Sequence, residues 1–161
     1  MKKFIISIDA GTTSNRSILF DLKGKPVFSS QKEFTQYFPK SGWVEHNPDE
    51  IWRTTLKTLK DVIHKAKRLR GKILSIGITN QRETTVLWDK KTGKPVYNAI
   101  VWQDRRQEDI CKKLRKQNKD TMVFNKTGLL IDSYFSGTKI KWILDYVPKA
   151  KQLMNKKQLL F

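Results

Sequence analysis

Cysteines, histidines and long apolar runs are scarce in this chain. Among its 161 residues there is one cysteine, Cys111, so no internal disulfide can form. The two histidines, His46 and His64, do not form a metal cluster with Cys111 in the sequence. No apolar run approaches the ~18 residues that a membrane helix needs. The first ten residues are too brief for a signal-peptide core. We therefore expect a cytoplasmic protein.

Acidic residues are also few. The chain has 33 lysines and arginines against 15 acidic residues, a net charge of +18, and most of the excess follows Leu56. Such a charge raises the possibility of nucleic-acid binding. Most of the basic residues are lysines, whereas recognition of base edges favours the rigid fork of arginine. A solvated basic surface is therefore the preferred interpretation, and a nucleic-acid site stays open as an alternative.

The first quarter of the chain predicts an antiparallel meander. The segment from Lys3 to Asp9, whose interior is mostly apolar, predicts a strand, and a small polar loop follows it. Arg16 to Asp21 predicts a second strand, and the turn Gly24–Pro26 leads into a third.

A helix is then expected to begin at Pro48, because Asn47 is a good N-cap and Glu50 completes a capping box. Its apolar positions recur at helical spacing: Ile51, Trp52, Thr55, Leu56, Leu59, Val62, Ile63 and Ala66.

The rest of the chain predicts further strands and helices. Strands are expected over Lys72–Thr79, Thr84–Trp88 and Val96–Trp102, and another strand opens near Leu159. Helices are expected over 104–116, with Cys111 on the buried side, and over 137–146, which Pro148 ends. Strands and helices mixed in this way predict an α/β fold: a mixed sheet whose antiparallel meander comes first, with helices packed on it. We expect residues 1–161 to belong to one incomplete lobe.

The loop after the first strand has the composition of a phosphate-binding turn. A glycine lets the backbone approach a phosphate closely, and hydroxyl and basic side chains surround it here: Gly11, Thr12, Thr13, Ser14 and Arg16. Asp9, at the end of the strand, is placed to hold a magnesium ion. Neither a Walker A loop nor a Gly-x-Gly-x-x-Gly fingerprint occurs in the chain. On this loop alone, an ordinary hairpin turn is an equally good interpretation.

Three polar or aromatic stretches could bind a small polyol. Arg82 and Glu83 offer neighbouring donors and an acceptor for hydroxyl groups, although such a patch is more often a connecting loop. Trp102 could present an apolar face to a carbon chain, and Tyr134 could order a ligand oxygen. Each aromatic side chain alone is more often part of the packing. No arrangement of serine or cysteine with histidine indicates covalent hydrolysis.

Taken together, these stretches resemble the glycerol kinases, a group within the carbohydrate-kinase family that has the ribonuclease H-like, actin-like ATPase fold. The matching runs follow the family's order: Ile8–Ser14, Gly42–His46, Gly77–Thr84, Asn98–Gln103 and Tyr134–Lys139. The Asn-Gln-Arg-Glu-Thr and Tyr-Phe-Ser-Gly-Thr-Lys runs separate glycerol kinases from their xylulose and ribulose relatives.

The resemblance implies a role for each candidate residue. Arg82, Glu83 and Tyr134 match residues that hydrogen-bond the glycerol hydroxyls, and Trp102 matches the ring against the carbon backbone. Thr12 and Thr13 match the hairpin near the ATP phosphates, and Arg16 matches its basic neighbour. Asp9 matches the acid linked to Mg²⁺. The implied reaction converts ATP and glycerol into ADP and glycerol 3-phosphate.

Family members are several times longer, and their catalytic aspartate lies beyond the position that matches Phe161. We therefore name no catalytic residue and expect little or no turnover from this chain alone. Unpaired strand edges predict association with a second copy or with the missing carboxy-terminal part. A non-catalytic piece that merely retains the fold is an alternative.

Overall fold

The computed structural model describes residues 1–161, which form two compact units. The sheet unit comprises Met1–Gln36 and Asp49–Gln81, and the helical unit comprises Tyr37–Pro48 and Arg82–Phe161. Each unit is built from segments that are not consecutive in the sequence. The assignment of 1–161 to a single lobe stays a prediction.

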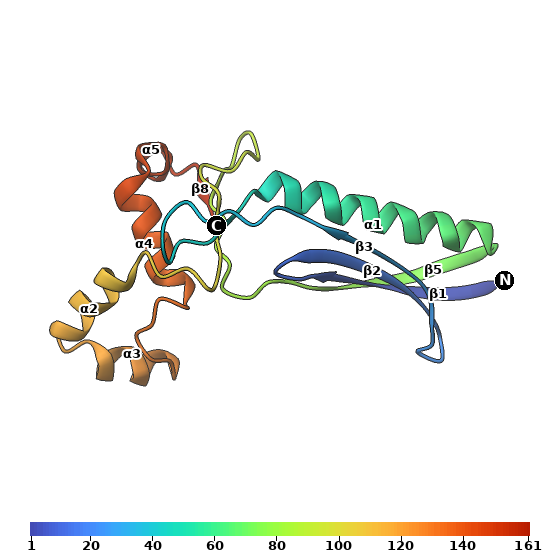
Figure 1. Cartoon of the computed structure of the whole chain (residues 1–161), viewed down its shortest axis with the longest axis horizontal. Coiled ribbons are helices and arrows are strands. Elements are labelled where there is room, and N and C mark those ends of the chain that lie inside the picture. Colours follow the sequence, from blue (N-terminus) through green and yellow to red (C-terminus); the bar gives the residue numbers. More distant parts are fainter. The chain divides into compact units, whose positions relative to one another are not determined.

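The sheet unit contains a four-stranded mixed sheet in the order β3-β2-β1-β5 (Figure 1). Strands β1 (Lys2–Ala10), β2 (Ser14–Asp21) and β3 (Pro26–Glu33) form the predicted antiparallel meander. Strand β5 (Gly71–Thr79) lies parallel to β1. A parallel neighbour requires a crossover connection, and a helix provides it here.

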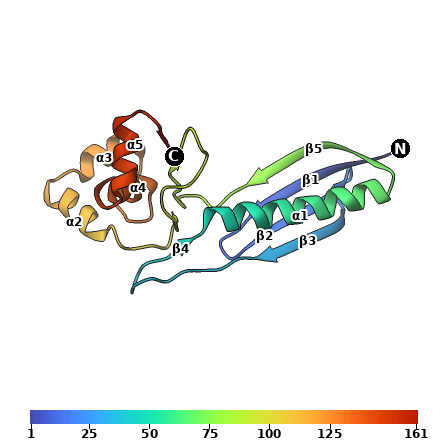
Figure 2. The same ribbon diagram turned by 90° about the horizontal axis from the view of Figure 1, so that it is seen from above.

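Helix α1 (Pro48–Arg68) lies along one face of this sheet (Figure 2) and begins at the predicted residue. Its first turn is acidic and its last turn basic, as the helix dipole favours. The apolar part of the core between helix and sheet contains these buried residues: Phe4, Ile6, Ile8, Leu19, Val62 and Ala66.

One of the apolar positions predicted at helical spacing on α1 faces solvent. Trp52 is 61% exposed, whereas the buried positions are Thr54, Thr58, Val62 and Ala66. The sheet explains the difference, because β2 presents two buried polar residues to the helix. The Asn15 amide donates to Thr54 Oγ1 over 2.6 Å, and the Ser17 and Thr58 hydroxyls lie 2.9 Å apart. Buried polar groups require partners of this kind.

Strand β5 forms one edge of the sheet, because its only neighbour is β1. Three large apolar side chains on it are exposed: Leu74 by 47%, Ile76 by 45% and Ile78 by 74%. An edge strand with exposed apolar residues is a site where another strand can pair.

The helical unit combines four helices with two small sheets. The helices are α2 (Glu108–Lys116), α3 (Asp120–Thr127), α4 (Ser136–Tyr146) and α5 (Pro148–Asn155). Strand β4 (Glu45–His46) pairs with β7 (Ala99–Ile100), and β6 (Trp88–Asp89) pairs with β8 (Leu159–Leu160). The predicted helix ending at Pro148 and the strand near Leu159 are confirmed, whereas α3 and α5 were not predicted.

Three predictions in the helical unit need correction. The strands expected over 84–88 and 96–102 are mostly irregular, and isolated bridges such as Thr85 with Ile100 replace longer ladders. The helix expected from Asp104 begins at Glu108. Asp104 is instead fully buried, and its carboxylate accepts hydrogen bonds from the backbone of Val44 and from Arg106. Those contacts hold the segment before α2 outside the helix.

A buried ionic cluster centres on Arg106. Its guanidinium forms ion pairs with Glu45 (2.7 Å) and Asp104 (2.8 Å) and lies 3.8 Å from the centre of the Trp43 ring. The phenol of Tyr97 donates to Glu45 over 2.7 Å. A buried charge is costly unless it is paired and hydrogen-bonded in this way. The cluster therefore joins segments of the helical unit that are far apart in sequence.

None of the five helices combines the length and the apolar character that a membrane span needs. Cys111 is a free, buried thiol on α2.

Candidate polyol and phosphate sites

Glu83 has an unusual backbone conformation and a fixed side chain. Its φ of 64° lies in the left-handed region, which costs a residue other than glycine about 1–3 kcal/mol. Its Oε2 accepts hydrogen bonds from the Ser136 backbone N–H (2.8 Å) and from the Ser136 hydroxyl (2.6 Å). Ser136 is the first residue of α4, where the helix dipole favours a negative charge. The contact thus holds the carboxylate next to the Tyr134 loop.

Trp102 and Tyr134 contact each other. Their ring centroids lie 6.0 Å apart in an edge-to-face arrangement, and Phe135 packs against Tyr134 at 5.2 Å. The backbone N–H of Trp102 donates to the Thr84 hydroxyl over 3.3 Å. Because Thr84 follows Glu83, this bond brings the Glu83 segment and the two rings into one neighbourhood of the helical unit.

The loop that carries Tyr134 is held by several side chains. The Tyr134 N–H donates to Asp132 Oδ1 over 2.7 Å. Arg105 donates to the Ser133 hydroxyl over 2.8 Å, and the buried amide of Gln107 donates to the Ser133 carbonyl over 2.5 Å. A loop with so many fixed polar groups has little freedom to change conformation.

The structure brings Glu83, Trp102 and Tyr134 together, as the sequence predicted for a polyol site. Arg82 is exposed, and it is connected to this group only through its peptide bond to Glu83. Three of the four predicted residues therefore share a neighbourhood, and the fourth adjoins it.

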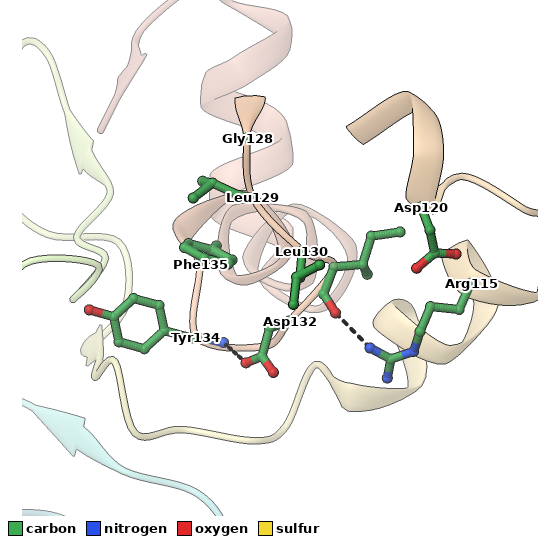
Figure 3. A pocket seen from close by; sticks show the side chains of 9 residues that line it. Arg115, Asp120, Gly128, Leu129, Leu130, Asp132, Tyr134 and Phe135 are labelled. Carbon is green, nitrogen blue, oxygen red and sulfur yellow. Dashed lines mark hydrogen bonds between the residues drawn. The ribbon is translucent and has the colours of Figure 1, made fainter. Parts of the chain in front are cut away.

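A separate pocket adjoins the Tyr134 loop. It has a volume of about 720 Å³ and is lined by residues that include Arg115, Leu130, Asp132 and Tyr134. Figure 3 shows the Tyr134 ring pointing away from Arg115 and Asp120. Of the four predicted polyol residues only Tyr134 reaches this cavity, so it is distinct from the candidate polyol site.

The candidate phosphate loop joins β1 and β2 in the sheet unit. The Gly11 N–H donates to the Ser14 carbonyl over 3.0 Å, and a Cβ at Gly11 would lie only 3.0 Å from that oxygen. The tight turn therefore favours glycine, whose N–H is already used within it. The hydroxyls of Thr12, Thr13 and Ser14 remain as the loop's candidate donors.

Arg16 and Asp9 lie opposite each other at the end of the β1–β2 ladder that adjoins the loop. Both are exposed, and Arg16 Nε donates to Gln31 over 3.1 Å. No group of three or more acidic, histidine or cysteine side chains gathers anywhere in the chain. A single carboxylate is still compatible with Mg²⁺, which usually keeps several waters and binds phosphate oxygens.

Several residues that shape these sites were not identified from the sequence. Ser136 and Lys139 occur in a run that was singled out for its tyrosine, and no periodic signal marks a buried lysine. Arg106 and Glu45 lie 61 positions apart, so no local pattern joins them. Only their occurrence in polar stretches beside aromatic residues hinted at a special environment.

Comparison with known proteins identifies the family. Residues 4–160 match the FGGY family of carbohydrate kinases, N-terminal domain. The chain belongs to this family. The sequence is 56% identical over 161 residues to a glycerol kinase of Alkaliphilus metalliredigens. It is 58% identical over 160 residues to a glycerol kinase of Oceanobacillus iheyensis. It spans 32% of the length of each of these curated relatives.

Solved structures of carbohydrate kinases have the same fold as this FGGY chain. A Plasmodium falciparum glycerol kinase with ADP matches 99% of the chain with a TM-score of 0.92 and 34% identity, and the match covers 32% of that protein. A gluconate kinase from Lactobacillus acidophilus matches with a TM-score of 0.83 at 23% identity, over 99% of this chain and 31% of that protein. The predicted actin-like ATPase fold, with its mixed sheet, is thereby confirmed.

Proposed function

We propose that the chain provides the glycerol-binding residues and the phosphate loop of an ATP-dependent glycerol kinase. The observation that carries the proposal is the grouping of Glu83, Trp102 and Tyr134 in one neighbourhood of the helical unit. These side chains supply an acceptor, an apolar face and a phenol, and a triol requires these three kinds of contact. The similarity to glycerol kinases supports glycerol as the substrate.

In this proposal each residue positions the triol rather than reacting with it. Glu83 keeps Oε1 for glycerol hydroxyls while Ser136 holds Oε2. Arg82 and Tyr134 donate to hydroxyl oxygens, and Trp102 covers the carbon chain and excludes water. Phosphoryl transfer depends mainly on such positioning and on neutralising charge.

The phosphate side of the proposal rests on the β1–β2 loop of the sheet unit. Gly11 permits the tight turn, Thr12, Thr13 and Ser14 donate to phosphate oxygens, and Arg16 adds positive charge. Asp9 holds water molecules of a Mg²⁺ ion, which would neutralise the phosphates when it is bound. ATP and Mg²⁺ are the cofactors that a kinase of this family implies.

Turnover requires more than this chain in our proposal. The chain spans 32% of its curated relatives, and no residue within it is assigned as the base for the glycerol hydroxyl. The partner is accordingly either a polypeptide equivalent to the remaining two thirds or a second copy of the chain. A free, buried thiol fits a reducing compartment, so we place the protein in the cytoplasm.

Complementation tests the proposal. The chain is co-expressed with the part of the Alkaliphilus metalliredigens relative that it does not match, and glycerol-dependent ADP release is measured. We expect activity from the pair and little or none from either part. A complex that forms without activity would favour a non-catalytic piece that only retains the fold.

Variants of two tyrosines sharpen this test. Tyr134→Phe removes the phenol from the polyol site and should raise the KM for glycerol about tenfold, the size of one hydrogen bond to a well-formed site. Tyr146→Phe is the matched control, because Tyr146 is 67% exposed at the end of α4. Equal kinetics for the two variants would remove Tyr134 from the site.

A further inference from the structure

Lys139 is a fully buried lysine whose ammonium group contacts only backbone oxygens. It lies on α4 with 0% of its surface exposed. Its Nζ donates to the carbonyls of Ser133 (2.8 Å), Tyr134 and Phe135 (3.4 Å). None of the ion pairs of the chain includes Lys139. An ammonium group has three N–H donors, so the three carbonyls use its full capacity.

A lysine at this buried position lowers the stability of the fold, because its ammonium group is removed from water. Lysine is almost never fully buried without a charged partner, and α4 buries Trp142 and Ile143 nearby. Burial lowers the pKa of Lys139 to about 8, although negative groups around it act in the opposite direction. A leucine or methionine would fill the same space at no electrostatic cost. The benefit of the lysine must therefore come from the three carbonyls.

These three carbonyls belong to consecutive residues centred on Tyr134. The Tyr134 peptide is fixed on both sides, because its N–H donates to Asp132 and its carbonyl accepts from Lys139. The next residue but one is Ser136, whose N–H and hydroxyl hold Glu83. Lys139 thus acts on the segment that places both the phenol and the carboxylate of the candidate polyol site.

We infer that Lys139 is a positioning residue: its ammonium group fixes the Ser133–Phe135 backbone and thereby aims the Tyr134 ring at the substrate. The inference rests on the proposed function for the identity of the substrate, but not for the hold on the loop. Lys139 touches neither the substrate nor a reacting atom. It acts through Tyr134 and, by way of Ser136, through Glu83.

The protonation of Lys139 gives a test that needs no mutation. The groups that bear on its charge are the carboxylates of Glu83, Asp104 and Asp132 and the thiol of Cys111. A neutral amine has only two N–H groups, so one carbonyl loses its donor when pH rises through about 8. The loop should loosen as a result.

Global stability should change in the opposite direction over the same range. The folded pKa of Lys139 lies below the ordinary value of ~10.4, so the unfolded chain binds more protons between pH 8 and 10. The contribution of Lys139 to the free energy of unfolding therefore rises with pH. Loop order and global stability are therefore expected to change in opposite directions as pH rises through about 8.

The experiment uses the 161-residue chain and compares Lys139→Met with Lys141→Met. Lys141 is the matched control, because it lies on the same helix with its side chain 59% exposed. Amide hydrogen exchange is expressed as protection relative to an unfolded peptide at the same pH. We expect Lys139→Met to lower the protection of the Tyr134 and Ser136 amides about tenfold, and Lys141→Met to leave it unchanged. In the unmodified chain, protection of the same amides should fall between pH 7 and 9.5.

Glycerol binding by calorimetry separates this inference from the proposed function. Lys139→Met should weaken glycerol binding about tenfold, and Lys141→Met should not change it. Unchanged protection of the Tyr134 loop in Lys139→Met would overturn the inference. If Lys139→Met does not fold, the pH series on the unmodified chain is the test. Protection of the Tyr134 and Ser136 amides that does not change with pH would then overturn the inference. A loop that responds in a chain that binds no glycerol, either alone or with the complementing part of the relative, would refute the proposed function and leave the hold on the loop supported.

Discussion

The guanidinium of Arg106 lies 2.7 Å from the carboxylate of Glu45, and both side chains are almost completely buried, with 0% and 4% of their surface exposed. The pair connects the segment after Trp43 with the segment before α2, and aromatic rings enclose it. Removing Arg106 leaves Glu45 and Asp104 as uncompensated buried charges, because both carboxylates pair with its guanidinium.

Arg106→Met should accordingly destabilise the helical unit by about 3–5 kcal/mol, the usual cost of breaking a buried ion pair. Urea unfolding followed by tryptophan fluorescence measures this loss, because Trp43 and Trp142 lie beside the guanidinium. Lys112→Met is the control, since that side chain is 61% exposed and its ion pair should contribute less than about 1 kcal/mol. Similar midpoints for the two variants would contradict a stabilising role of the cluster.

Acid should weaken the same cluster through Glu45. Burial opposes ionisation of this carboxyl group, but hydrogen bonds from Asn98, Tyr97 and Arg106 outweigh it and lower its pKa. A lowered folded pKa means that the stabilisation is complete above the unfolded value of ~4.3 and is lost as pH falls through the folded one. We expect the free energy of unfolding to fall more steeply below pH 4.5 in the unmodified chain than in Glu45→Gln. Parallel pH profiles for the two chains would show that Glu45 does not contribute to the acid sensitivity of the free energy of unfolding.

Two glycines of β5 should respond differently to a methyl group. A Cβ at Gly71 would lie 2.1 Å from the ring of Phe4, which is 97% buried in the sheet core, whereas a Cβ at Gly77 would meet nothing within 4 Å. Gly71→Ala should therefore cost about 1–3 kcal/mol by overpacking, and Gly77→Ala should be neutral or slightly stabilising. Thermal unfolding of the two variants compares them directly, and equal transition temperatures would contradict the close packing of Phe4.

The exposed edge of β5 should mediate association with a second copy of the chain. Ile76 and Ile78 offer apolar surface beside unpaired backbone groups, but a net charge of +18 opposes contact between copies. We expect the dimer fraction to rise with salt, because salt screens the repulsion and leaves strand pairing intact. Light scattering at 50 mM and 500 mM salt measures it.

Matched variants locate that association. Ile78→Lys should abolish it, whereas Leu22→Lys, at an exposed position in the β2–β3 turn, should weaken it only through charge. A monomer at both salt concentrations would rule out pairing at this edge.

Local signals in the sequence were sufficient to predict the meander of the sheet unit and the start of α1. Asn47 and Pro48 marked the start of α1, and the turn at Gly24 marked the meander, because caps and turns depend on neighbouring residues. The face that α1 buries was not predictable in the same way. It depends on Asn15 and Ser17 of β2, which select Thr54 and Thr58 instead of Trp52.

The helical unit was harder to predict because its segments are held in place by contacts between residues that are far apart in the sequence. The extended segments near Thr85 and Ile100 are held by isolated bridges, so their composition overstated the length of the strands. The buried position of Lys139 contradicts the general preference of lysine for water, and no pattern in one sequence signals that exception. The polyol residues were identified by resemblance to glycerol kinases, and the contact between Trp102 and Tyr134 is what the structure adds.

The division of the chain into interleaved segments has a practical consequence. The polypeptide passes between the units three times, after residues 36, 48 and 81. A single cut of the chain therefore cannot release either unit whole. Splitting the molecule into independently folding halves would require rejoining its segments in a new order.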